Sequence, residues 1–286
     1  MAKRNLVGIA GLVSAIALGA CSAMGQVVPA DEVADAQVPV ALEKHRVVIL
    51  TDMEADPDDT QSLVRLLLYA NEIDIEALVA TTSIWKKENI RPDSIRVTLG
   101  KYGEVYDTLS QHAQGYPSEA ELQDLVMSGQ PGYGMASVGT GRSTEGSDAI
   151  IDLLEAEDER PLWISVWGGA NTLAQALYDI RETRSEAEAE RLISKLRVYT
   201  ISDQDDSGIW MRREFPGLFY IVSPGEYGRS TWTAITHGFP GFEDHISNQW
   251  IAENIQQDQG PLGARYPDVV WGMEGDTPAY LSLIPN

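Results

Sequence analysis

The sequence predicts an α/β fold in which an open, mostly parallel sheet carries helices on both faces. Residues 46–51, RVVILT, form a run of β-branched and apolar side chains that is typical of a buried strand. Residues 60–71 place apolar side chains at helical spacing, and residues 75–82 again have the composition of a strand. A strand, a helix and a second strand joined by short connections indicate a βαβ unit, the building block of parallel sheets.

The rest of the chain continues this alternation. Further strands are expected at residues 161–167, 197–202 and 218–223, and further helices at residues 147–154, 171–180 and 185–196. The segments 117–146 and 203–215 lie between these elements and are expected to be loops. The first is rich in glycine but lacks the Gly-Lys-Ser/Thr ending of a phosphate-binding P-loop, so we interpret it as a wall or lid over a site.

The N-terminal segment has the features of an export signal. Lys3 and Arg4 precede an apolar stretch at residues 6–18, and the following LGAC, which ends at Cys21, resembles the lipobox of bacterial lipoproteins. We therefore expect a lipoprotein signal peptide at residues 1–21, a flexible tether at 22–44 and one domain at 45–286. The protein is then anchored by lipid in the cell envelope, facing the periplasm or the exterior, and does not span the membrane. An ordinary signal with an incidental Cys is the alternative.

The composition restricts the partners of this domain. Asp and Glu number 43 against 21 Lys and Arg, which gives a formal net charge of −22. Such a surface repels nucleic acids and other polyanions, so the expected ligands are neutral, cationic or bridged by a metal. A role of the charge in solubility is equally compatible with the sequence, and so is a homo-oligomer.

Five carboxylates are crowded into the segment TDMEADPDD, at residues 51–59, immediately after the first expected strand. They are Asp52, Glu54, Asp56, Asp58 and Asp59. Ligands of open parallel sheets bind at the carboxyl ends of the strands, and capping the next helix needs only one or two acids. Hard oxygen ligands without His or Cys nearby favour Ca²⁺, with Mg²⁺ second, over zinc or copper. A solvated acidic turn is the alternative, and Asp56 beside a proline is the expected bystander.

Four of these acids follow a known spacing. Asp52, Glu54, Asp58 and Asp59 resemble the pattern strand, Asp-x-Asp-x-x-x-Asp-Asp of the nucleoside hydrolases, with Glu in place of the second Asp. The resemblance continues in IDIEALVATT at 73–82, GGANTLAQAL at 168–177 and EGDTPAYLSLI at 274–284. Together these phrases look most like the nucleoside-hydrolase-like domain of bacterial cellulose-binding proteins. The resemblance implies a Rossmann-like architecture over residues 46–284.

The resemblance also implies roles for individual residues. Glu54 would bind the metal and activate water as the catalytic base, with Asp52 supporting the loop. The other metal ligands would be Asp59, Asp276 and the backbone carbonyl of Asn171. Asp58 would hold a sugar hydroxyl. From the residues themselves, Trp210 in the polar loop DDSGIWMRR is the tryptophan best placed to stack on a sugar ring.

Three departures from the family pattern point away from a nucleoside substrate. Gly275 stands where many nucleoside hydrolases have a His that assists the leaving base, and Trp85 with Lys86 lies near the place of an Asn that contacts ribose. Glu54 carries one methylene more than Asp. We therefore expect a metal-dependent hydrolase of a glycosidic C–O or C–N bond in a carbohydrate-type ligand, acting by metal-activated water. The alternative is a lipoprotein that binds a cellulose-like polysaccharide at the same site without turnover.

Overall fold

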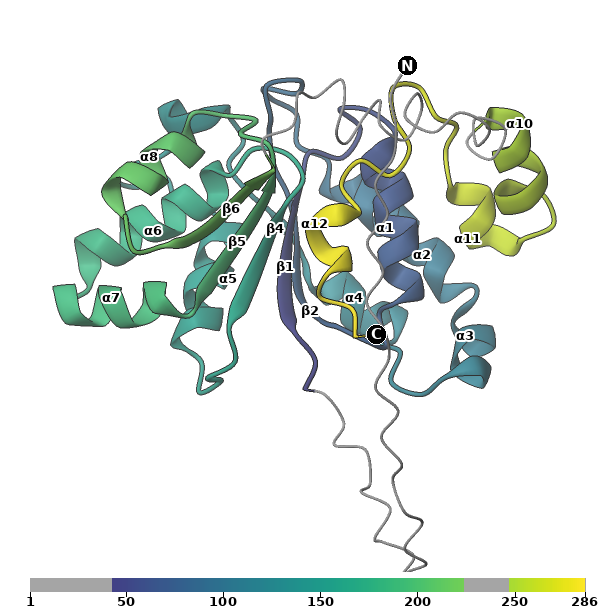
Figure 1. Cartoon of the computed structure of the whole chain (residues 1–286), viewed down its shortest axis with the longest axis horizontal. Helices are drawn as coiled ribbons and strands as arrows, with labels where there is room; N and C mark the ends of the chain where they lie inside the picture. Colours follow the sequence, from purple (N-terminus) through teal and green to yellow (C-terminus); the bar gives the residue numbers. More distant parts are fainter. Residues whose placement is uncertain (1–42, 224–246, 286) are drawn as a thin grey trace, which may run out of the picture. The chain divides into compact units, whose positions relative to one another are not determined.

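The computed structural model describes residues 43–223 and 247–285, and within them the fold is the expected α/β sheet (Figure 1). Six strands pair in the order β3-β2-β1-β4-β5-β6, and every neighbouring pair is parallel. The strands are β1 (Arg46–Thr51), β2 (Asp74–Ala80), β3 (Val126–Ser128), β4 (Leu162–Val166), β5 (Leu196–Ile201) and β6 (Phe219–Ser223). The prediction of an open parallel sheet is therefore confirmed.

Strand β1 shows why an unbroken apolar sequence suits the centre of this sheet. It pairs with β2 on one side and β4 on the other, and all of its residues are buried. Successive side chains of a strand point to opposite faces. Val47 and Ile49 accordingly join one hydrophobic cluster, and Val48 and Leu50 join the other. A strand buried on both faces needs apolar side chains at every position rather than at alternate ones.

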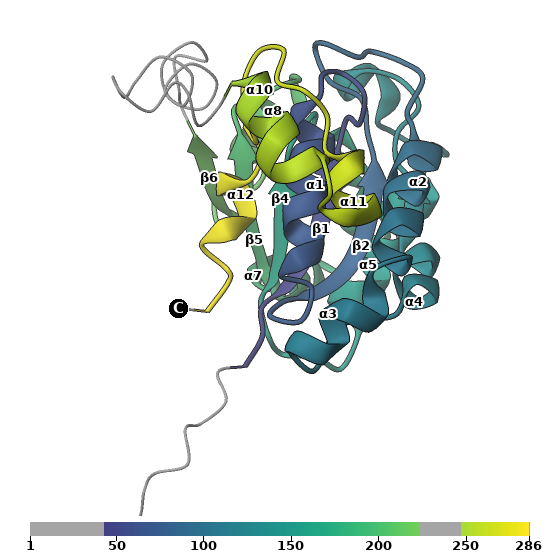
Figure 2. The ribbon, with the colours of Figure 1, turned by 90° about the vertical axis from the view of Figure 1, so that its right-hand side faces the viewer.

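Helices cover both faces of the sheet, as Figures 1 and 2 show. The cluster that contains Val47 is covered by α1 (Asp58–Leu68), α2 (Pro92–Gly103), α4 (Glu119–Asp124), α11 (Gly260–Arg265) and α12 (Pro278–Leu281). The opposite cluster is covered by α5 (Glu145–Glu155), α6 (Asn171–Thr183), α7 (Glu186–Ser194) and α8 (Ser207–Glu214). The remaining described elements are α3 (Tyr106–His112), the 3-10 turn η1 (Gly134–Ser137), α10 (Asn248–Ile251) and the π-helical turn η3 (Ala252–Gln256).

Two differences from the expected elements bear on the site. The first helix begins at Asp58 rather than at residue 60, so that Asp58 and Asp59 lie in its first turn. Carboxylates are favoured there because the backbone N–H groups of a helix N-terminus are unpaired and carry partial positive charge. The expected loops at 117–146 and 203–215 contain regular elements, namely α4, β3 and η1 in the first and α8 in the second. Each element of the first segment is too short to impose a periodic pattern on the sequence.

The parts predicted for the N-terminus fall largely outside the described residues. The signal peptide, Cys21 and the tether up to residue 42 belong to the undescribed part of the chain, so these expectations stay predictions. Between residues 43 and 223 and between 247 and 285, no helix has both the length and the apolar character needed to cross a membrane.

Candidate functional site

A small, tightly packed cavity lies where the polar residues that follow the parallel strands meet. Because all six strands run in the same direction, the segments that follow them emerge along one edge. Among the described residues, the lining comes from the ends of β1, β2, β4 and β5, from the start of α1 and from the turn before α12. The lining residues are Asp52, Asp56, Asp58, Asp59, Trp85, Trp167, Gln204 and Asp276.

Three of the aspartates form a compact group. One carboxylate oxygen of each of Asp56, Asp58 and Asp59 lies within 4.8 Å of those of the other two. The Thr51 hydroxyl donates a hydrogen bond to Asp59, and the backbone N–H of Asp58 donates one to the Asp56 carboxylate at 3.3 Å. Asp56, expected from the sequence to be a bystander, is therefore part of the acidic cavity.

Asp52 reaches the same cavity from the residue after β1. Its side chain packs against the turn that follows β4, where Gly168 has no side chain. A Cβ atom at Gly168 would lie 2.6 Å from Asp52 Oδ1, closer than atoms pack in folded proteins. The Asp52 carboxylate therefore occupies the space that a side chain at position 168 would fill.

Asp276 is brought from the far end of the domain by a loop that Glu274 holds against α1. The Glu274 carboxylate accepts hydrogen bonds from Arg65 Nη2 and from the Tyr266 hydroxyl, both at 2.8 Å. Its backbone N–H donates to Gln61 Oε1, also at 2.8 Å. Arg65 and Gln61 belong to α1, the helix whose first turn carries Asp58 and Asp59. The late loop and the first helix are thus fixed to each other beside the cavity.

The electrostatics of the cavity strongly disfavour charged carboxylates. Burial raises the pKa of Asp52 to about 7. Burial, followed by the repulsion of neighbouring carboxylates, raises the pKa values of Asp58, Asp59 and Asp276 well above their usual range. Each of these four side chains is at most 3% exposed. A bound cation would relieve both the burial of charge and the repulsion.

Two buried carboxylate oxygens of the cavity also lack partners. Asp58 Oδ2 and Asp276 Oδ2 accept no hydrogen bond from any described residue. Buried polar atoms are nearly always paired, so these carboxylate oxygens are available to a bound cation or a water. The donor set consists of hard carboxylate oxygens, without sulfur or imidazole among the lining residues, and it fits a hard divalent cation.

The structure does not bring Glu54 into this cavity. Glu54 adopts a positive φ of 70°, and its exposed side chain turns toward α2, where it pairs with Arg91 and accepts a hydrogen bond from Ser94 Oγ at 2.6 Å. It lines a separate, open pocket of about 330 Å³, beside Arg265. Asp56 is the one acid that borders both spaces.

Asn171 and Trp210 are not among the residues that line the cavity. Asn171 is fully buried at the start of α6, and its side-chain amide donates to the Gly132 carbonyl at 2.8 Å. Trp210, on α8, packs edge to face on Phe215 with ring centroids 5.5 Å apart, and the guanidinium of Arg181 lies 5.4 Å from its ring centre. Trp210 is therefore a packing residue in this arrangement.

Sequence reasoning missed Gln204. It is 4% exposed and donates to the backbone carbonyls of Trp167 and Ile201, whereas its Oε1 has no partner among the described residues. Its position directly after β5 is the signal that could have found it. The neighbouring acids are more conspicuous in the sequence, but each of them contacts another part of the fold. Asp203 pairs with Arg212, Asp205 accepts from the Asn171 N–H at 3.2 Å, and Asp206 accepts from the Met135 N–H at 2.8 Å.

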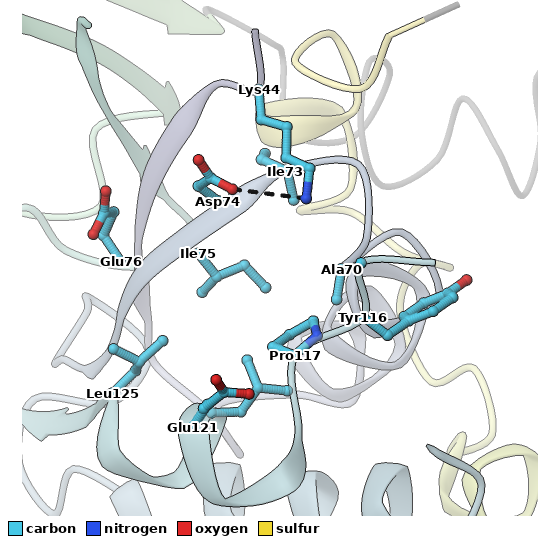
Figure 3. Close-up of a pocket in the computed structure, with 12 residues that line it drawn as sticks. Lys44, Ala70, Ile73, Asp74, Ile75, Glu76, Tyr116, Pro117, Glu121 and Leu125 are labelled. Atoms are coloured by element: carbon cyan, nitrogen blue, oxygen red, sulfur yellow. Dashed lines mark ion pairs between the residues drawn. The ribbon is translucent and has the colours of Figure 1, made fainter. Parts of the chain in front are cut away.

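A larger cavity, of about 480 Å³, lies beside the opposite end of β2 (Figure 3). Lys44, Asp74, Tyr116 and Glu121 are among the residues that line it. Its charged groups have partners, since Asp74 lies 3.9 Å from the Lys44 ammonium and 2.6 Å from the Arg160 guanidinium. It holds no cluster of unpaired oxygens like that of the acidic cavity.

Comparison with solved structures identifies a related protein. The chain is 41% identical to a nucleoside hydrolase-related hypothetical protein from Saccharophagus degradans that is associated with carbohydrate metabolism, with a TM-score of 0.75. The match covers 84% of this chain and 55% of that protein, so the present chain corresponds to little more than half of its relative. The effector protein XOO4466 matches at 12% identity over 85% of this chain and 81% of its own, and its TM-score of 0.49 is too low to bear on fold or function. No curated protein matches the chain.

The family comparison agrees with the motifs. The model of the family described as cellulose-binding Sde182, nucleoside hydrolase-like domain, matches residues 46–286. This range begins at the first residue of β1 and includes every lining residue of the acidic cavity. The chain therefore belongs to the family described as cellulose-binding Sde182, nucleoside hydrolase-like domain.

Proposed function

We propose that the acidic cavity binds a divalent cation together with a carbohydrate, and that the domain hydrolyses a glycosidic bond there. The observation that carries the proposal is the convergence of five aspartates, two of them with unpaired buried oxygens, on one cavity. Ca²⁺ suits this donor set better than Mg²⁺. It accepts an irregular cage of carboxylates, whereas Mg²⁺ usually keeps several of its own waters.

The residues that line the cavity would have different roles. Asp56, Asp58 and Asp59 would hold the cation, because their oxygens are the ones grouped within 4.8 Å, and Asp276 would close the shell from the other side. A bound cation of this kind lowers the pKa of a water and binds sugar hydroxyls. Asp52 is left to accept the proton of the attacking water, and Gln204 Oε1 is left to accept a hydrogen bond from a sugar hydroxyl.

One observation favours binding without turnover as the second candidate. Glu54, which corresponds in position to an acid of the hydrolase pattern, is engaged by Arg91 and Ser94 outside the cavity. A site that lost one acid of its catalytic set could keep its affinity for sugars. The description of the family as cellulose-binding is compatible with either outcome.

The deciding experiment joins metal analysis to binding and product detection. The purified protein would be titrated with Ca²⁺, and then with cello-oligosaccharides, xylo-oligosaccharides and inosine, with released products separated by chromatography. The hydrolase proposal expects Ca²⁺ in the protein and a reducing sugar as product. Binding without any product would favour the second candidate, and absence of divalent metal binding at millimolar supply would exclude both.

Two variants separate the roles in that experiment. Asp59→Asn keeps the size of the side chain but removes a charge from the cation group, so Ca²⁺ and sugar binding should both fall. Asp52→Asn should keep sugar binding and lose product formation, since it removes only the proposed base. Equal activity of Asp52→Asn and the wild type would assign the base elsewhere.

We also propose that the domain is anchored in the cell envelope through a lipid on Cys21. The sequence LGAC and the preceding apolar stretch support this proposal. Labelled palmitate should enter the wild-type protein in cells and should not enter a Cys21→Ser variant. Equal labelling of the two would contradict it.

A further inference from the structure

Trp85 combines two properties that are not found together elsewhere among the described tryptophans. It lines the acidic cavity beside Asp52, Asp56 and Asp58, and its side chain is 64% exposed. Trp167 also lines the cavity but is buried, and Trp271 is 70% exposed but does not line it. A large aromatic face is therefore presented at the border between the carboxylates and solvent.

The backbone around Trp85 is held in one conformation. The Ser83 N–H donates to the Lys86 carbonyl at 2.9 Å, and the Ser83 hydroxyl accepts from the N–H groups of Trp85 and Lys86 at 3.0 and 3.1 Å. The Ile84 N–H donates to the carbonyl of Gln204, a residue of the cavity wall, at 2.8 Å. Hydrogen bonds thus fix the turn after β2 to the wall of the cavity. Binding of a ligand to Trp85 would therefore cost the protein little backbone entropy.

The chemistry on the two sides of this border matches one class of ligand. Carboxylates, or a cation held by them, bind hydroxyl groups, whereas an indole face packs on apolar C–H groups. A pyranose ring whose hydroxyls are equatorial has a rim of hydroxyls and flat faces of axial C–H groups. A furanose ring is puckered and has no comparable flat face.

We propose that Trp85 is the stacking platform for a pyranose ring whose hydroxyls reach the acidic cavity. This inference rests on the proposed function and names the aromatic residue that a sugar ring would contact there. It assigns to Trp85 the part that the sequence suggested for Trp210, which packs on Phe215 instead.

Isothermal titration calorimetry with cellohexaose in saturating Ca²⁺ tests the assignment. In Trp85→Ala we expect the Kd to rise about ten-fold or more, since covering one face of an indole removes tens of Å² of apolar surface from water. Trp85→Phe, which keeps a smaller flat ring, should lose less. Trp271→Ala is the matched control, and its Kd should stay within about two-fold of the wild type because it lies outside the lining.

Intrinsic fluorescence supplies a readout that a purely structural role would not move. Cellohexaose should change the emission of the wild type and of Trp271→Ala, and the change should be small or absent in Trp85→Phe even where calorimetry shows binding. Melting temperatures of the variants should equal that of the wild type, because the side chain is mostly exposed.

The possible failures are distinguishable. If the wild type binds cellohexaose and Trp85→Ala binds it equally well, or if both tryptophan-to-alanine variants lose the same affinity, the stacking assignment is wrong while the proposed function stands. If the wild type binds inosine more tightly than cellohexaose and Trp85→Ala loses that binding, the aromatic face serves a nucleobase and the ligand class is wrong. If the wild type binds no sugar at all, the proposed function fails and the inference with it.

Discussion

Arg91 holds Glu54 in an ion pair outside the acidic cavity. Glu54 is the one acid of the hydrolase-like spacing that departs from Asp, and it is also the one that the structure turns away from the other three. The side chain of Glu54, which is one methylene longer than that of Asp, reaches Ser94 on α2. Glu54 therefore has its own partner outside the cavity and is not a slightly shifted member of the carboxylate group.

Glu54→Gln should therefore leave Ca²⁺ binding nearly intact. We expect a change in the Kd of about three-fold or less, whereas Asp59→Asn should raise it about ten-fold or more because it removes one charged ligand from the buried group. Calorimetric titration with Ca²⁺ measures both. A loss of binding in Glu54→Gln as large as that in Asp59→Asn would restore Glu54 to the metal shell.

The metal-free protein should lose stability as the pH rises. The pKa of Asp52 is raised by burial from 3.8 to about 7, so the folded state holds a proton that the unfolded state releases between these values. The penalty is absent below about pH 4 and complete above about pH 7, and it is on the order of a few kcal/mol. Urea unfolding with a chelator at about pH 5 and about pH 8 measures the difference, and Ca²⁺ should stabilise more at the higher pH. Equal stability at both pH values would contradict the buried charge.

Glu274→Ala should destabilise the domain and weaken its cation binding together. It removes the carboxylate that accepts hydrogen bonds from Arg65 and from the Tyr266 hydroxyl. The charged guanidinium of Arg65 is then left without this acceptor. Loss of such a hydrogen bond costs about 1.5–3 kcal/mol in the free energy of unfolding. Tyr266→Phe, which removes one neutral donor, should cost less and should retain Ca²⁺ affinity. Chemical denaturation and calorimetry compare the two, and unchanged cation binding in Glu274→Ala would show that the loop places Asp276 without this contact.

Gly168→Ala should act on the cavity through Asp52. The added Cβ would meet Asp52 Oδ1 at 2.6 Å, so either the carboxylate or the turn after β4 must move, at a cost of about 1–3 kcal/mol in unfolding free energy. Gly217→Ala is the matched control, because no atom lies within 4 Å of a Cβ built there. Sugar hydrolysis should fall in the first variant and persist in the second. Normal activity of Gly168→Ala would mean that Asp52 has room to relocate.

The sequence predicts the arrangement of the sheet well because the middle of its central strand is buried on both faces and is apolar, as at residues 47–50 of β1. It also predicts the edge at which Asp52, Asp58 and Asp59 gather, since parallel strands end together. The short elements α4, β3 and η1 escape prediction because they contain too few residues to repeat a pattern.

The orientation of side chains at the site is a different matter. Nothing in the local sequence shows that the backbone of Glu54 takes a positive φ, and Arg91, which receives the side chain, lies in another part of the chain. Gln204 stands between acids that were more conspicuous, and only the fold shows that it faces the cavity while Asp205 caps a helix. The sequence thus indicates which loops meet, and tertiary contacts decide which side chains turn inward.

The acidic cavity draws on the first helix of the domain and on the turn before α12, because Asp59 belongs to α1 and Asp276 lies two residues before α12. A cation shared between them would act as a clasp that joins two segments remote in the chain. Amide hydrogens of α12 should then exchange with solvent more slowly when Ca²⁺ is present, while those of α7, which contributes no residue to the cavity, should be unaffected. The stability of the packing between these two segments would in this way depend on bound calcium.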